Sequence, residues 1–276
     1  MVNETFDSKR FGRYFRYDIS QFWHNNGKAA LLLGFLSVIS YLVWITGSLV
    51  FTGTWSAPGV AARIVFFFLG FMALVLYQSR TYGYLTEKRA GQSWLMLPAS
   101  TLEKFISMMI ITILVIPCAY ILSYLALDSL IGLVDKTSGG PLVTGFSNVA
   151  DGFSKALSAA SEEGVHIHVG AFALPLVLQF ILNLLYFLLC GICFKKWKIM
   201  GAIGVLLGLQ MVSTPLISSA VFKYWTPALA DYNYSEDPVQ VLEIVNNMIN
   251  FSTILNAVVL VGLAAGIYYR LKTLKH

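Results

Sequence analysis

Two cysteines, Cys190 and Cys193, have the spacing C-G-I-C, which can serve dithiol redox chemistry or metal binding. Both lie in an apolar run, where small polarizable side chains ordinarily pack against neighbouring helices. His166 and His168 also have a metal-ligand spacing, but no cysteine or further histidine lies near them in the sequence. We therefore predict no catalytic residue, no metal and no cofactor on this chain.

Polar side chains inside apolar runs are a second candidate group, comprising Gln179, Asn183, Gln210 and Asn256. Gln179 and Asn183 are four residues apart, so they share one face of a helix. Such groups are costly in lipid, and we expect them to face protein or a polar pathway. Two interpretations stay open: hydrogen bonds between helices, or a stripe that lines a translocation route.

Several kinds of chemistry have no residues to carry them. The apolar runs contain no Lys, Arg, Asp or Glu that could relay a proton, which disfavours an ion-coupled transporter. The sequence also lacks H-E-x-x-H and G-x-S-x-G, which disfavours an intramembrane enzyme. It has no G-x-x-x-x-G-K-[ST], so any ATP-driven motor would be another polypeptide.

The composition places these residues in a membrane. Of 276 residues, 57% are hydrophobic and 12% charged, against roughly 25% charged in soluble domains. This much apolar surface excludes a soluble globular protein and a disordered one. The net charge of +5 comes from short basic clusters beside apolar runs, a pattern of membrane topology, so we expect no nucleic-acid partner.

Six apolar runs predict an all-α integral membrane protein with six transmembrane helices. The predicted spans are 29–51, 57–78, 102–127, 169–194, 199–222 and 250–269. Residues 1–28 would form an N-terminal cytoplasmic segment, residues 29–276 the membrane domain, and 129–168 a long outer loop. We expect amphipathic helices over 146–160 in that loop and over 238–250 before the last span.

The basic residues orient the spans. With both termini in the cytoplasm, fifteen of the nineteen Lys and Arg fall on the cytoplasmic side. This bias predicts a multi-pass protein of the cytoplasmic membrane with both ends inside.

Residues 10–26 have the pattern of an amphipathic helix on the inner membrane surface. Phe11, Phe15, Ile19 and Phe22 fall in one sector, opposite several arginines. Packing of this aromatic stripe against protein is the alternative. Asp18 lies at the edge of the sector, where we expect a salt bridge to another cytoplasmic segment.

The segment between the second and third spans, residues 78–104, is too long for a hairpin turn and too apolar for a solvated linker. A short helix is predicted from Thr86 to Leu97, because Pro98 disfavours helix at the residue before it. Ser100-x-x-Glu103 then has the pattern of a capping box that begins the third span.

This segment resembles a known family. Glu87-Lys-Arg-Ala-Gly91, followed by Leu95-x-Leu97-Pro98-Ala-Ser100, is similar to the cytoplasmic segment after the second span of type 2 ABC-transporter permeases. In that family the segment contains the coupling helix, which lies in a cleft of the ATP-binding subunit. The helix at 10–26 resembles the elbow helix of the same family.

The resemblance implies a permease subunit that moves an unidentified substrate, with a separate ABC ATP-binding subunit and a second permease as partners in the bilayer. Glu87 would meet a basic residue of the ATPase, and Trp94 and Leu95 would fill its cleft. The docking residues implied are Glu87, Gly91, Trp94, Leu95, Leu97 and Pro98. The alternatives are a non-transporting scaffold or regulatory subunit and a lipid-modifying membrane enzyme.

Overall fold

The computed structural model describes residues 6–162, 169–224 and 238–273, and the regular structure within these ranges is helical. The helices are α1 (Ser8–Gly34), α2 (Leu36–Thr52), α3 (Val60–Thr81), η1 (Gly83–Thr86), α4 (Lys88–Leu95), α5 (Thr101–Ile110), η2 (Ile111–Val115), α6 (Ile116–Val134), η3 (Lys136–Ser138), α7 (Leu142–Glu162), α8 (Val169–Cys193), α9 (Lys198–Tyr224) and α11 (Pro238–Thr273).

Four stretches of helix within the described residues are long and apolar enough to cross a membrane. They are Val60–Thr86, Thr101–Val134, Ala173–Cys193 and Asn246–Thr273. α2 and the Lys198–Met211 part of α9 are apolar as well but shorter. This is the architecture of a helical multi-pass membrane protein, as the composition predicts.

Three expectations about helix boundaries are corrected, the first being that the predicted span 29–51 is divided at Phe35 between α1 and α2. α1 runs unbroken from Ser8 to Gly34, so the surface helix and the start of the first apolar run form one helix rather than two. α11 likewise joins the expected outer helix and the last span in one helix of 36 residues. Apolar runs end at the first polar residues, but backbone hydrogen bonding continues until a residue that breaks it. Residues 239–261 contain no glycine or proline.

The Thr101–Val134 helix contains a single turn of π-helix, η2, between α5 and α6. Pro117 follows this turn and has no N–H to donate to the preceding turn. A wider turn accommodates such a residue without ending the helix.

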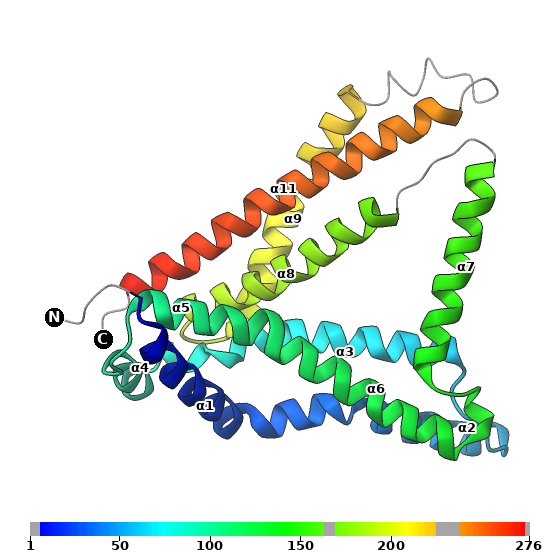
Figure 1. The fold of residues 1–276 in the computed structure, drawn as a ribbon, viewed down its shortest axis with the longest axis horizontal. Coiled ribbons are helices and arrows are strands. Elements are labelled where there is room, and N and C mark those ends of the chain that lie inside the picture. The colour runs from blue at the N-terminus through cyan, green and yellow to red at the C-terminus, as the bar shows by residue number, and fades with distance from the viewer. Residues whose placement is uncertain (1–5, 163–168, 225–237, 274–276) are drawn as a thin grey trace.

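The helices form two groups that meet at one end of the molecule and diverge toward the other (Figure 1). α1, α2, α3, α5 and α6 make one group, and α8, α9 and α11 make the other. The groups touch where α3 packs on α8 and α5 packs on α11. The beginning of α1, the end of α11 and α4 lie at this closed end, whereas α7 stands at the open end (Figure 1).

A buried ion pair organises the open end. Arg63 Nη2 of α3 lies 3.2 Å from Asp128 Oδ2 of α6, and the same carboxylate oxygen accepts a hydrogen bond from the backbone N–H of Leu142 at 2.8 Å. The Arg63 guanidinium also donates to the carbonyl of Gly140 at 2.9 Å. These bonds fix the start of α7, and the helix predicted over 146–160 is confirmed.

The expectation that the spans hold no charged residue is corrected here. α6 continues past Asp128 to Val134, so this carboxylate lies inside the helix, and Arg63 is buried at 3% exposure rather than extended toward water. A buried charge needs a partner, and these two residues supply one another. His166 and His168 lie outside the described residues.

Candidate functional site

The corner between α3 and α5 is built from local sequence signals. The hydroxyl of Ser100 accepts from the Glu103 N–H at 3.2 Å, and Glu103 Oε2 accepts from the Ser100 N–H at 2.9 Å. This is the predicted capping box. The predicted helix over 86–97 is shorter, with the 3-10 turn η1 before it and α4 confined to Lys88–Leu95.

The residues expected to dock a partner divide between two faces of this corner. Glu87, Leu95 and Pro98 are exposed, and Leu97 is half-buried, whereas Gly91 is buried. Met96 is 84% exposed and adds to the apolar surface beside Leu95. The resemblance does not include Met96 among the docking residues. We call Glu87, Leu95, Met96 and Pro98 the outer face of the corner.

Trp94 does not lie on this face, which corrects the expectation that it fills a cleft of another protein. Its side chain is 3% exposed, and its Nε1 donates a hydrogen bond to the Tyr14 hydroxyl of α1 at 3.1 Å. The physical reason is that Leu85 of η1, Met108 of α5 and Leu271 of α11 cover the indole ring in a buried cluster, while Tyr14 of α1 offers an acceptor for its N–H. Trp94 is therefore an internal support of the corner.

Three residues of α1, spaced four apart on one helix face, hold the corner in place. Arg10 Nη2 pairs with Glu103 Oε1 at 2.7 Å, Tyr14 accepts from Trp94, and Asp18 Oδ2 accepts from the Ser107 hydroxyl at 2.5 Å. We call Arg10, Tyr14 and Asp18 the polar ladder. It connects α1 to α4 and to the first two turns of α5.

Asp18 is 2% exposed, and it also accepts a hydrogen bond from the Tyr82 hydroxyl at 3.1 Å. The salt bridge expected for Asp18 is therefore wrong, because its observed partners are two neutral hydroxyls. Burial raises the pKa of Asp18, and the two hydrogen bonds oppose that rise only in part.

The aromatic stripe of α1 faces protein over most of its length. Phe15, Ile19 and Phe22 pack against the core cluster that contains Phe67 and Tyr120. Phe11 is half-buried and stacks on Phe15 with ring centroids 5.8 Å apart. These contacts favour the packing alternative for the stripe, because its apolar area is covered by this chain's own helices.

Two lysines bind backbone carbonyls at the ends of the corner, which the sequence pattern did not indicate. Lys104 Nζ donates to the carbonyl of Trp94 at 2.9 Å and lies 4.5 Å from the centroid of its ring. Lys198 Nζ, at the start of α9, donates to the carbonyl of Gly83 at 2.6 Å. Each carbonyl also accepts a local hydrogen bond, from the Thr86 hydroxyl at Gly83 and from the Leu97 N–H at Trp94, so the cations add long-range partners at both ends of the corner.

The four polar span residues lie on three helices. Gln179 is exposed and Asn183 half-buried on α8, Gln210 is exposed on α9, and Asn256 is half-buried on α11. Their role as packing groups or as the lining of a route stays a prediction. Cys190 is buried and Cys193 exposed on α8, each as a free thiol.

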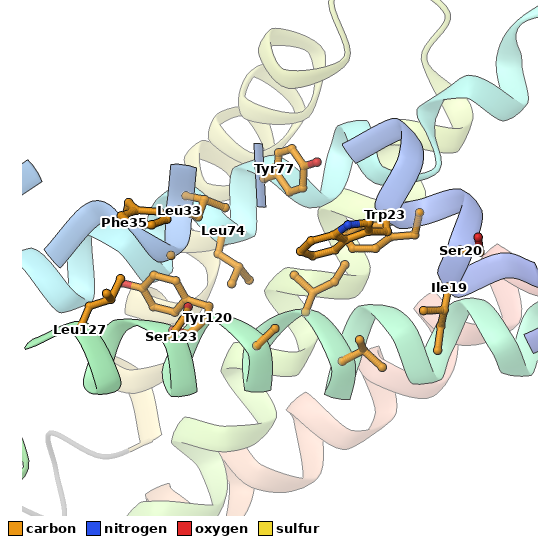
Figure 2. A pocket seen from close by; sticks show the side chains of 15 residues that line it. Ile19, Ser20, Trp23, Leu33, Phe35, Leu74, Tyr77, Tyr120, Ser123 and Leu127 are labelled. Carbon is orange, nitrogen blue, oxygen red and sulfur yellow. The ribbon is translucent and has the colours of Figure 1, made fainter. Parts of the chain in front are cut away.

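An apolar cavity of about 460 Å³ lies between α1, α3 and α6. Leu74 and Tyr77 of α3, Leu33 of α1 and Tyr120 of α6 line it, with Trp23 across one side (Figure 2). Its lining is mostly hydrocarbon and aromatic ring and includes no acid, amine, thiol or imidazole. It is thus suited to hold hydrocarbon and lacks the groups of a catalytic site.

No protein-family model, curated protein or solved structure matches this chain.

Proposed function

We propose that the chain is the membrane-spanning permease subunit of an ABC transporter and moves a substrate across the cytoplasmic membrane with ATP hydrolysed by a separate subunit. One observation carries this proposal. The short α4 lies at a corner between two long apolar helices, and the side chains of Glu87, Leu95 and Met96 are exposed there. A surface of this shape suits mechanical contact with another protein.

The polar ladder gives the corner a means to transmit force. A partner that pushes on α4 would move α1 through the Tyr14–Trp94 bond and α5 through Glu103 and Ser107, since these hydrogen bonds join the three helices. Packed elements with fixed contacts shift as units rather than deform. Such a shift is what alternating access by a permease requires.

In this proposal the chain has six spans with both termini in the cytoplasm, and it pairs with a second permease. α11 supports such pairing or lipid contact, because Ile254, Val258 and Val261 are each at least 64% exposed. Large exposed apolar areas are covered in the working protein by lipid or by another subunit.

A non-transporting scaffold or regulatory subunit is the second candidate. The same outer face favours it, because docking alone does not require movement of the spans. Solute transport in reconstituted membranes separates the two functions, because a permease combined with its ATPase moves a solute and a scaffold does not.

The test compares two variants of the outer face with a matched control. Glu87→Lys and the pair Leu95→Ala with Met96→Ala should weaken co-purification of an ATP-binding subunit, by roughly tenfold or more in affinity if these residues dominate the interface. Val149→Ala, which truncates an exposed side chain of α7 at the opposite end of the molecule, should leave co-purification unchanged.

A third variant separates docking from transmission. Trp94→Phe removes the hydrogen bond to Tyr14 but leaves the outer face intact. We expect it to bind the ATPase normally and to lower substrate movement per ATP hydrolysed. Normal ATPase binding and normal transport by the outer-face variants would contradict the proposed docking site.

A further inference from the structure

A groove of about 940 Å³ opens beside the corner, between α1, the end of α3 with η1, and the connection from α8 to α9. The side of α1 that lines it presents the amides Gln21 and Asn25. This side of α1 is separate from the one that borders the apolar cavity, which is lined by Ile19, Phe22 and Trp23.

The groove is predominantly basic. Arg80, Lys195 and Lys198 line it, with Glu87 as the one carboxylate among the lining residues. Lys198 is engaged with the carbonyl of Gly83, whereas Arg80 and Lys195 are exposed. Two exposed cations next to uncharged amide donors form a site that favours a phosphate group.

The groove also has an apolar border. Trp197 is 77% exposed and has the left-handed backbone conformation, with φ of 55°, which is uncommon for a residue other than glycine. Met200 is 63% exposed, and Leu207, two turns further along α9, continues the exposed apolar surface on the same side. Tryptophan beside lysine at the end of an apolar helix is the pattern of a membrane interface.

We propose that this groove binds the headgroup of an anionic phospholipid. The phosphate lies between Arg80 and Lys195, and Gln21 and Asn25 donate hydrogen bonds to headgroup oxygens. The acyl chains follow the exposed apolar surface of α9 from Trp197 and Met200. An acidic protein segment would match the charge but would have no use for this apolar path, which is why a lipid is the occupant that fits.

The bound lipid would join α1, η1 and the α8–α9 connection, which border the groove next to Glu87 of the outer face. It would therefore stiffen the corner. The binding site itself stands independently of the permease proposal, because none of its contacts involves an ATPase.

The test uses the purified full chain in detergent and measures quenching of tryptophan fluorescence by brominated phosphatidylglycerol. We expect half-maximal quenching at a much lower concentration than with brominated phosphatidylcholine. Trp197→Phe should remove most of the headgroup-selective quenching. Arg80→Gln with Lys195→Gln should raise the phosphatidylglycerol concentration needed by on the order of tenfold, and salt should do the same to the unmodified chain.

The matched control removes two exposed cations of α1 outside the groove, by Arg16→Gln with Lys28→Gln, and should leave the selectivity intact. If the groove pair does not remain monodisperse, Lys195→Gln alone makes the same comparison. Equal quenching by both lipids, an unchanged response of the groove variant, or an equal loss in the control pair would overturn the proposal. Displacement of the lipid by inorganic phosphate at equal concentration would assign the groove to a free anion instead.

Discussion

The carboxylate of Asp18 stands in the middle of the contact between α1 and the corner, where Ser107 and Tyr82 both donate to it. If Asp18 is removed, both hydroxyls lose a buried acceptor. A buried polar group without a partner costs about 1–3 kcal/mol. Asp18 therefore contributes more to the fold through its acceptor oxygen than through its charge.

We predict that Asp18→Ala destabilises the protein by about 1–3 kcal/mol and that Asp18→Asn, which keeps an acceptor oxygen, costs less. Thermal unfolding of the purified chain in detergent measures both. A larger loss in the Asn variant than in the Ala variant at neutral pH would show that the charge, and not the acceptor, is what matters.

We also predict that the stability difference between the unmodified chain and Asp18→Asn depends on pH. Because burial raises the pKa of Asp18 in the folded state, the folded chain binds this proton more tightly than the unfolded chain does. That stabilisation is complete below the unfolded pKa of about 3.9 and is lost as pH rises through the folded pKa. The Tm of the unmodified chain should therefore fall relative to Asp18→Asn as pH rises from about 4. A Tm of the unmodified chain that stays constant or rises relative to that of Asp18→Asn over this pH range would contradict the assignment.

Residue-scale features differ in how far sequence predicts them. The Ser100–Glu103 capping box is local, and its pattern is visible in four consecutive residues. The polar ladder joins residues 80 to 93 positions apart, so nothing in the spacing of Arg10, Tyr14 and Asp18 identifies their partners. The burial of Trp94 escapes sequence reasoning for the same reason, because the helices α8 and α11 that help to bury it lie far away in the sequence.

At the scale of elements, the two helix groups are joined by a close backbone contact between α3 and α8. A Cβ at Gly191 would stand 2.2 Å from the carbonyl oxygen of Ser79, so only glycine fits at this crossing. Small residues allow membrane helices to approach in this way. The contact lies near the closed end, where the groups meet.

We predict that Gly191→Ala separates α3 from α8 and destabilises the chain by about 1–3 kcal/mol, because the obstructing atom belongs to the backbone and cannot rotate away. Gly204→Ala on α9 is the control, since a Cβ there would meet nothing within 4 Å. Thermal unfolding of the two variants checks this. Equal melting temperatures would mean that the helices do not cross this closely.

Hydrophobicity predicted the existence of these helices better than their limits. The apolar runs correspond to α2, α3, the Thr101–Val134 helix, α8, α9 and α11. The apolar runs predict helix boundaries near residues 28 and 250, whereas the structure has continuous helix at both places. A change from polar to apolar residues does not by itself end a helix. The buried pair Arg63–Asp128 was missed because it joins the ends of two different helices.

At the scale of the whole molecule, α4 and α7 lie at opposite ends of the diverging helix groups (Figure 1). If the helices cross a membrane, these ends face opposite compartments. Single cysteines at Met96 and Val149, both exposed, test this in a chain whose three native cysteines are replaced.

Membrane-impermeant maleimide added to intact cells should label position 149 and not position 96, and both should label after the membrane is opened. This outcome follows from the concentration of Lys and Arg near α4. Labelling of position 96 alone from outside would invert the topology, and labelling of both would exclude opposite placement.

The central claim is that the outer face of the corner contacts an ATP-binding subunit. A photo-reactive amino acid in place of Met96 tests it in intact cells, with the same group at Met72, an exposed residue of α3 within an apolar span, as the control. We expect position 96 to cross-link to a protein with a P-loop ATPase domain, identified by mass spectrometry, and position 72 to give no such adduct. Absence of such an adduct at position 96 in a folded and functional variant, or an equal adduct at position 72, would contradict it.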